Sequence, residues 1–532
     1  MRLATRFLAL AVMAWVICAV ALAEPCESLL KLNLAATSIS AAQSQPAGTF
    51  TPPAGKPLAN LPAFCRVVGE IHPVDDSTIK FEVWLPASGW NGKFQGIGNG
   101  GFAGSIGFSQ MADAVAHGYA TASTDTGHTG DGIDATWALG HPEKIVDFGY
   151  RAIHETALRA KEIIRAFYGD GPRRSYFNSC SNGGRQALME AQRFPQDYDG
   201  IIAGAPANYW THLLANAAWD VLALLGEKDS YIPASKLPAI QTAALAACDA
   251  LDGVKDGVIE RPMRCHFDPI VLQCAGPESD SCLTVPQVAA LKKLYASSRS
   301  SNGRQIFPGY SPGGEAEPGG WGAWITGPAP ERSLMFAFGT QFYKNMVFDN
   351  AAWDYHSFNV DRDTKAADDK MARILNATDP DLRRFRARGG RLILYHGWSD
   401  AAIPALNTID YYQSVVAKMG AENAGSFVRL FMVPGMQHCG GGSGPNNFGQ
   451  FGVPHVDPQH DIDAALERWV EQGIPPEQII ATKYKNDSDP KSGLVRTRPL
   501  CADPLVARYK GSGSTDEAAN FSCAAPEPAT HR

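Results

Sequence analysis

The amino-acid sequence predicts an α/β fold whose mostly parallel sheet is interrupted by one large inserted segment. Strand-like and helix-like runs alternate from about residue 80 to residue 207, and the alternation resumes after residue 379. Such alternation is typical of parallel strands with helices on both faces of the sheet. The chain between these parts is irregular and rich in Cys, Pro, Gly and Trp. We therefore expect a discontinuous core of residues 24–207 and 379–532, with residues 208–378 as a lid domain.

The elements of the core are predicted from their periodicity and their end signals. Residues 79–86 alternate like an exposed strand, and residues 92–104 read as a strand that continues into a glycine-rich loop. Residues 146–169 have helical apolar spacing and end at Gly169, a typical helix stop. Further strands, some with the loop that follows, are expected at 119–127, 173–181, 198–206, 389–400 and 427–442, and further helices at 183–195, 409–420 and 461–473.

The N-terminus has the pattern of a secretory signal peptide. Arg2 and Arg6 precede an apolar stretch from Leu8 to Val20, and Ala21-Leu22-Ala23 then forms a cleavage site. We expect residues 1–23 to be removed and the mature protein to be secreted, either to the periplasm or outside the cell. No later segment reaches the ~18 apolar residues of a membrane span.

Composition excludes some classes of partner. The chain has 45% hydrophobic and 19% charged residues, with a formal net charge of −7 and no block of like charge. This balance is that of an ordinary globular protein, and it does not favour nucleic acid or an anionic membrane as partner.

Cysteine usage agrees with export. Of eleven cysteines, Cys18 lies in the expected signal peptide, and the even number that remains predicts disulfides. No C-x-x-C pair occurs, so a zinc site of that kind is not expected. Sequence neighbours suggest the pairs Cys26–Cys65, Cys248–Cys265, Cys274–Cys282 and Cys501–Cys523, which leaves Cys180 and Cys439 as a fifth pair by elimination.

The stretch "NSCSNGGR", residues 178–185, nearly matches the G-x-S-x-G motif of a nucleophile elbow. A serine hydroxyl becomes a nucleophile when a histidine takes its proton and a carboxylate orients that histidine. In α/β-hydrolases these groups occur in the order Ser, Asp/Glu, His, each after a strand. Ser181, Asp400 and His438 follow that order, so we predict an α/β-hydrolase core with this triad. His396, near Asp400, could either support that carboxylate or be a packing residue, and a packing role is the preferred interpretation.

Two cysteines flank the expected catalytic pair. If Cys180 bonds Cys439, their Cα atoms lie within about 4.4–6.8 Å of each other. Ser181 and His438 are the chain neighbours of these cysteines. The crosslink would therefore bring the serine beside the histidine, although a simple staple of two loops would use the same bond.

The oxyanion of the reaction needs two backbone N–H donors. The first is expected from Asn182, which follows the nucleophile at the start of a helix. The second is expected from the loop "GNGGFAG", at Gly100 or Gly101. A glycine-rich turn without this role remains the alternative.

The motifs "CSNGGR", "GWSDAAIP" and "PGMQHCGGG" together resemble those of the tannase and feruloyl esterase family of secreted α/β-hydrolases. The resemblance extends from near Cys26 to Cys523. It implies that Cys180 and Cys439 are bonded and that the chain hydrolyses small aromatic esters, some of them attached to plant polysaccharides or polyphenols. Feruloyl esters are the first choice, galloyl esters of the tannase type the second, and terephthalate monoesters the third.

The lid contains aromatic residues that would suit an aromatic acyl group, although each is more often simply core. They are Trp210, Trp321, Trp324, Phe342 and Tyr343. Two other classes of protein remain open at this point. One is a serine peptidase or acyltransferase on the same core, and the other is a non-catalytic, calcium-stabilised binding protein.

A calcium site is expected in the lid segment "CDALDGVKDGVIE". Asp249, Asp252 and Asp256 supply hard carboxylate ligands in a tight loop, whereas a pair of Asp-Gly turns explains the same residues equally well. The family resemblance favours Ca²⁺, and it implies that the carbonyls of Val254 and Val258 complete the ligand set. The ion would be structural rather than catalytic.

Overall fold

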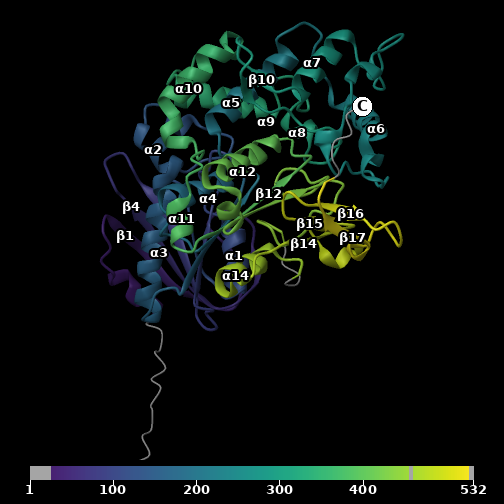
Figure 1. Cartoon of the computed structure of the whole chain (residues 1–532). Helices are drawn as coiled ribbons and strands as arrows, with labels where there is room; N and C mark the ends of the chain where they lie inside the picture. The colour runs from purple at the N-terminus through teal and green to yellow at the C-terminus, as the bar shows by residue number, and fades with distance from the viewer. Residues whose placement is uncertain (1–24, 454–458, 527–532) are drawn as a thin grey trace, which may run out of the picture.

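A computed structural model of the whole chain describes residues 25–453 and 459–526 (Figure 1). The expected signal peptide, residues 1–23, lies outside the described residues. The described chain forms one α/β core, a helical lid inserted between β9 and β12, and two small hairpins at the C-terminal end.

The core is a nine-stranded sheet in the order β1-β4-β5-β7-β6-β8-β9-β12-β13. The strands from β7 to β13 in this order are parallel, and β1, β4 and β5 add an antiparallel edge. The parallel part agrees with the predicted fold. The strand bounds are β1 Thr37–Gln45, β4 Phe64–Ile71, β5 Ile79–Pro86, β6 Lys93–Ile97, β7 Ala120–Thr124, β8 Arg174–Cys180, β9 Gly200–Gly204, β12 Arg391–Gly397 and β13 Val428–Val433.

Helices cover both faces of the sheet, and each face has its own apolar core. On one face, α3 (Ala152–Tyr168), α4 (Asn182–Arg193) and α12 (Leu406–Met419) bury Phe94 and Phe177. On the other face, α14 (Ile462–Gln472) and the end of α1 (Phe108–Ala116) pack on Tyr176 and Tyr395. The helix predicted at 146–169 begins earlier, at α2 (Pro142–Val146), and passes through a π-helical turn at Asp147–Arg151 before α3.

The segment between β9 and β12 is more regular than the sequence indicates. Its helices from α5 to α10 lie together above the sheet, whereas α11 lies lower, beside α4 of the core (Figure 1). Helix α5 is buried around most of its surface, so its apolar residues do not form the one-sided stripe by which a helix is recognised in sequence. The helices are α5 Trp210–Leu225, α6 Leu237–Cys248, α7 Val285–Tyr295, α8 Trp321–Trp324, α9 Leu334–Phe342, α10 Val360–Leu375 and α11 Arg383–Ala387.

Two C-terminal hairpins pack against the acidic loop of the lid. Strand β14 (Gln478–Tyr484) pairs with β15 (Leu494–Cys501), and β16 (Val506–Tyr509) pairs with β17 (Phe521–Ala524). Val254 of the lid lies in one apolar cluster with Phe521. The sequence analysis did not identify these hairpins, nor the N-terminal strands β1 and β4.

Five disulfides are present among the described residues. They join Cys26–Cys65, Cys180–Cys439, Cys248–Cys265, Cys274–Cys282 and Cys501–Cys523, the same pairs that the sequence suggested. Disulfides in such number are typical of proteins that fold in an oxidising compartment.

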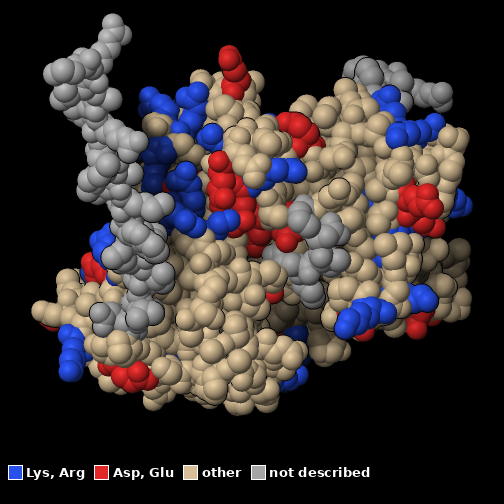
Figure 2. Space-filling view, turned by 90° about the horizontal axis from the view of Figure 1, so that it is seen from below, with Lys and Arg blue, Asp and Glu red and all other residues tan. Residues whose placement is uncertain are grey.

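The surface shows mixed charge. On the face in Figure 2, basic side chains gather at one side, next to acidic side chains at the centre. Within the described ranges no helix has the length and apolar character that crossing a bilayer requires.

Candidate active site

The expected nucleophile stands in a strained turn between β8 and α4. Ser181 has φ 67° and ψ −126°, a conformation that side-chain-bearing residues rarely adopt and that is typical of a nucleophile elbow. The two glycines that follow make the turn possible. A Cβ at Gly183 would lie 1.9 Å from Ser179 Oγ, and one at Gly184 would lie 2.3 Å from the carbonyl oxygen of Gly204. Ser179, at the first glycine position of the motif, points into the packing under the helix.

Asp400 and His438 meet at the carboxyl ends of β12 and β13. His438 Nδ1 lies 2.8 Å from Asp400 Oδ2, while Oδ1 accepts N–H bonds from Ala402 and Ile403 at 2.8 Å each. Burial would raise the pKa of Asp400, but the charge of His438 and hydrogen bonds from His396 and His438 hold it well below its usual range. Asp400 is therefore a carboxylate that accepts from His438 Nδ1 and leaves Nε2 free to face the nucleophile.

His396 belongs to the same hydrogen-bond network, where the sequence favoured a packing role. Its Nε2 lies 3.1 Å from Asp400 Oδ2 and 2.9 Å from the carbonyl of Ile403, so Nε2 carries a proton and donates. Its Nδ1 lies 2.7 Å from Thr408 Oγ1, which donates to it. The side chain is fully buried, and it donates to Oδ2 of Asp400, the same oxygen that His438 contacts. Its spacing of four residues from Asp400 was the only signal in the sequence.

The disulfide Cys180–Cys439 connects the two loops that carry Ser181 and His438. The Cα atoms of the cysteines are 6.0 Å apart. Their strands, β8 and β13, are not neighbours, because β9 and β12 lie between them in the sheet. The bond therefore crosses the carboxyl edge of the sheet and holds Ser181 and His438 on the same side of it.

The loop after β6 is shaped to present backbone N–H groups. Asn99 anchors it, donating its N–H to Gln186 Oε1 at 2.9 Å and its side-chain amide to Thr124 at 2.8 Å. Gly101 has φ +55°, and a Cβ there would lie 2.2 Å from the carbonyl of Gly132. In the described part of the chain, the N–H groups of Gly100 and Gly101 have no acceptor. Asn182 opens α4, so its N–H also lacks an intrahelical acceptor.

A buried carboxyl group, Asp125, lies behind this loop. It is 3% exposed, and its Oδ1 accepts N–H bonds from Lys80 at 3.0 Å and Gly127 at 2.9 Å. The carbonyl of Asp125 accepts from Gly104 at 3.2 Å, which connects it to the loop. Asp125 thus supports the loop rather than joining the triad, in agreement with its position before the serine in the chain.

We expect the substitution Asp125→Asn to increase stability progressively above pH 4 and fully at pH 8. Burial raises the pKa of Asp125 from 3.8 to about 7, so the folded protein keeps a proton that the unfolded chain releases above pH 3.8. Stability therefore falls as pH rises through this range, by about 4 kcal/mol. Asparagine retains the shared acceptor oxygen and removes this loss. Urea unfolding at pH 4.5 and pH 8 measures the difference, and equal stability of the two proteins at pH 8 would contradict it.

Only one of the five lid aromatics lies against the expected catalytic histidine. The Trp324 ring is 5.1 Å from the His438 ring at 72°, and it stacks on Phe338 at 5.9 Å. Phe338 in turn packs on Phe102, the residue after Gly101, at 5.2 Å. An aromatic wall of Trp324 and Phe338 therefore lies beside the histidine, and the fully buried Phe102 connects it to the glycine loop. Phe338 was missed in the sequence, because aromatic residues in a lid carry no code for which face they line.

The other four aromatics are core residues, the alternative to a pocket role that the sequence left open. Trp210 packs on Phe102 and Phe148 from below the wall. Trp321 is 2% exposed between lid helices, and Phe342 and Tyr343 are fully buried in the lid. Their large apolar surfaces stabilise the lid rather than face a substrate.

The acidic loop of the lid contains all the expected calcium ligands within a few residues of one another in the chain. In the described chain the carbonyls of Val254 and Val258 have no hydrogen-bond donor. Burial, together with the charge of Asp256, raises the pKa of Asp252. Asp249 accepts N–H bonds from Asp256 and Gly257, both at 3.1 Å. Asp256 contacts Arg498 at 2.6 Å. Free carbonyls and a buried carboxylate fit Ca²⁺, although Asp249 and Asp256 have other partners here.

A parallel sheet with a nucleophile elbow after one strand and a buried Asp–His pair after two others defines an α/β-hydrolase fold. A family model described as tannase and feruloyl esterase matches residues 65–524. The chain belongs to this family and is a carboxylic ester hydrolase.

Individual relatives are similar to this chain over most of its length. An uncharacterized esterase of Xanthomonas campestris pv. campestris is 47% identical and covers 94% of this chain and 91% of its own length. A mono(2-hydroxyethyl) terephthalate hydrolase of Piscinibacter sakaiensis is 34% identical, with 89% and 87% covered. The crystal structure of feruloyl esterase B from Aspergillus oryzae superposes with a TM-score of 0.86 at 31% identity, covering 94% of this chain and 99% of that one.

Proposed function

We propose that the protein is a secreted serine esterase that hydrolyses esters of hydroxycinnamic-type aromatic acids, with feruloyl esters as the preferred class. The observation that carries the mechanism is the buried Asp400–His438 pair, held beside the strained Ser181 turn by the Cys180–Cys439 bond. The substrate class is supported by the aromatic wall of Trp324 and Phe338 beside His438, and by the feruloyl esterases among the relatives.

The mechanism follows from these positions. Ser181 Oγ attacks the ester carbonyl carbon while His438 Nε2 takes its proton, and Asp400 stabilises the imidazolium that forms. The N–H groups of Asn182 and of Gly100 or Gly101 donate to the oxyanion. His438 then returns the proton to the leaving alcohol as the C–O bond breaks. Water, deprotonated by His438, releases the acid from Ser181.

A hydrolysis panel tests the substrate class. Methyl ferulate, methyl gallate and a terephthalate monoester differ in acyl group while sharing one ester bond to be broken. We expect the highest kcat/KM for methyl ferulate, followed by methyl gallate. A terephthalate monoester preferred by ten-fold or more would instead support the relation to the hydrolase from Piscinibacter sakaiensis, and Trp324→Ala would show whether the aromatic wall decides the order.

Two other classes are separated by different measurements. A peptidase would cleave an anilide or peptide of the same acyl group at a rate comparable to the ester, and an acyltransferase would transfer the acyl group to an added alcohol in preference to water. A non-catalytic binding protein would not be labelled at Ser181 by a fluorophosphonate.

Export is supported by the five disulfides and is tested by N-terminal sequencing of the secreted protein, which should begin at Glu24.

We also propose a structural Ca²⁺ bound by the lid loop. Carboxylates of Asp249, Asp252 and Asp256 with the carbonyls of Val254 and Val258 would hold it, and the ion would supply positive charge to a buried acidic loop. The adjacent Cys248–Cys265 disulfide and the C-terminal hairpins already fix this loop on two sides. The ion is therefore expected to stabilise the lid rather than take part in the chemistry.

Removal of calcium is expected to lower the Tm. A ligand at 100 times its Kd stabilises the folded state by about 2.7 kcal/mol, which corresponds to a shift of a few degrees in a chain of this size. Thermal unfolding after EGTA treatment, with and without added CaCl2, measures the shift. Asp252→Asn should abolish it, whereas the exposed lid residue Asp280, changed to Asn, should leave it unchanged. If the Tm of the wild type does not change with Ca²⁺, the proposed calcium site is wrong.

A further inference from the structure

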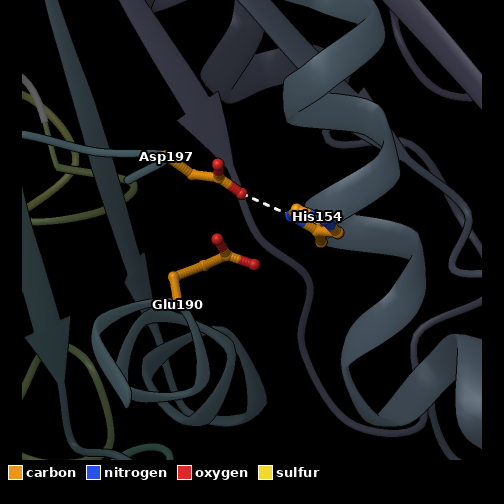
Figure 3. Close-up of side chains that lie close together, drawn as sticks. All are labelled: His154, Glu190 and Asp197. Atoms are coloured by element: carbon orange, nitrogen blue, oxygen red, sulfur yellow. Dashed lines mark hydrogen bonds and ion pairs between the residues drawn. The ribbon is translucent and has the colours of Figure 1, made fainter. Parts of the chain in front are cut away.

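Three side chains that could bind a metal ion converge at the end of α4 far from Ser181. His154 on α3, Glu190 on α4 and Asp197 in the turn before β9 each offer one ligand atom, and these atoms lie within 4.8 Å of one another (Figure 3). Glu190 follows Asn182 by eight residues along the helix, which is a rise of about 12 Å. The cluster is therefore separate from the proposed catalytic centre.

Glu190 has no hydrogen-bond donor that would explain its position. It is 1% exposed, and among the described residues neither carboxylate oxygen accepts a hydrogen bond from an N–H or hydroxyl group. Its side chain points towards Asp197 and His154 (Figure 3). Burial, then the charge of Asp197 and a hydrogen bond between the two carboxyl groups, raise the pKa of Glu190 well above its usual range. An unpaired buried carboxyl group is costly, and binding a cation is one way in which proteins compensate it.

The positive groups around the cluster are directed to carbonyls rather than to these carboxylates. The Lys161 ammonium donates to the main-chain oxygen of Asp197, and Arg388 donates to the carbonyl of Pro195 at 2.7 Å. His154 Nδ1 lies 2.5 Å from Asp197 Oδ2, and its ring stacks on Phe194 at 3.8 Å. The imidazole is therefore held with one nitrogen facing both carboxyl groups.

We propose that His154, Glu190 and Asp197 form a structural binding site for a single Zn²⁺ ion. One imidazole nitrogen and two carboxylate oxygens are a ligand set that suits Zn²⁺, with a water in the fourth position. Ligands at about 2.0 Å in a tetrahedron are about 3.3 Å apart, so the contact between His154 and Asp197 opens by about 0.8 Å on binding. The side chain of His154 is 17% exposed, which provides a path from solvent.

The ion would connect α3, the end of α4 and the turn into β9. Because it lies at the opposite end of α4 from the nucleophile, it stabilises the helix that positions Ser181 without touching a substrate. The alternative to a bound zinc ion is a proton shared between Glu190 and Asp197. This alternative predicts a different result for the Glu190 variant described below.

Zinc titration of the mature protein in excess Ca²⁺ tests the site, since a filled lid loop then cannot contribute. We expect one Zn²⁺ per chain by calorimetry, a saturable rise in Tm, and proton release that varies with buffer. Co²⁺ should give the visible absorption bands of a four-coordinate site. Glu190→Gln should weaken zinc binding at least about ten-fold. The matched control is His212→Gln, which removes a buried His–Asp contact of 3.0 Å that has no second carboxylate.

The outcomes divide clearly. If the wild type shows no saturable zinc binding, or if Glu190→Gln binds zinc as the wild type does, the proposal is wrong. A higher Tm of Glu190→Gln without metal, combined with no zinc binding by the wild type, supports the shared proton instead. Should Glu190→Gln not fold, His154→Gln, which alters a partly exposed residue, takes its place in the titration. All these readouts are of binding, so they are independent of whether the proposed esterase activity is observed.

Discussion

Replacing Ser181 by alanine is expected to reduce kcat for methyl ferulate by about 10⁴-fold or more. The variant loses the atom that attacks the ester, and members of a catalytic triad typically cost this much when removed. Alanine keeps the Cβ of serine, so the strained backbone of the elbow is retained and the fold should not change. Initial rates with the purified variant measure the effect.

The matched control for this substitution is the neighbouring serine. Ser179 is fully buried with an unpaired hydroxyl, so Ser179→Ala should leave kcat within about three-fold of the wild type. Labelling by a fluorophosphonate should disappear in Ser181→Ala and persist in Ser179→Ala. Wild-type hydrolysis by Ser181→Ala would exclude the proposed mechanism.

The second large effect is expected when the bond between Cys180 and Cys439 is removed by changing both residues to serine. The bond closes a separation of 259 residues, for which the chain-entropy relation gives about 5 kcal/mol, an upper value because other disulfides restrain the same chain. The loops that carry Ser181 and His438 also lose their direct connection, so we expect kcat/KM to fall about 10- to 100-fold. Urea unfolding and ester hydrolysis measure the two effects.

A second disulfide provides the comparison. Cys274 and Cys282 are separated by 8 residues in the lid, for which the same relation gives about 2.5 kcal/mol. Changing both to serine should reduce stability less and should leave kcat/KM within about two-fold. If both double variants lose activity equally, the Cys180–Cys439 bond has only a structural role.

Much of the fold could be predicted because the relevant signals are local. Strand β8 and helix α4 were predicted from periodicity, and the glycines that follow Ser181 are required by contacts within a few ångströms of the turn. The antiparallel strands β1 and β4 were missed, since β1 pairs with a strand that does not follow it directly in the chain. The hairpins β14–β15 and β16–β17 were also missed, although each strand pairs with its neighbour in sequence. Helix α5 was missed because it is buried on most sides.

The candidate site divides in the same way. The meeting of Asp400 and His438 could be predicted because each follows a strand in a fixed order, and Cys180 and Cys439 indicated that Ser181 lies near His438. The second histidine on Asp400 could not be assigned, because whether His396 donates to that carboxylate depends on Thr408 and Ile403 around it. Likewise, Trp324 is distinguished from the other lid aromatics only by its contact with His438.

By itself the sequence determined the α/β-hydrolase class, the resemblance to the tannase and feruloyl esterase family, the five cysteine pairs, and the residues proposed as nucleophile, acid and histidine. Only the tertiary structure decided which aromatics face the site, how His396 fixes Asp400, and that His154, Glu190 and Asp197 converge at the end of α4. The physical reason is that a sequence motif predicts only those positions that are fixed by residues close to them in the chain. Contacts between α3, α4 and the turn before β9 instead depend on how whole elements pack, which no short stretch of sequence specifies.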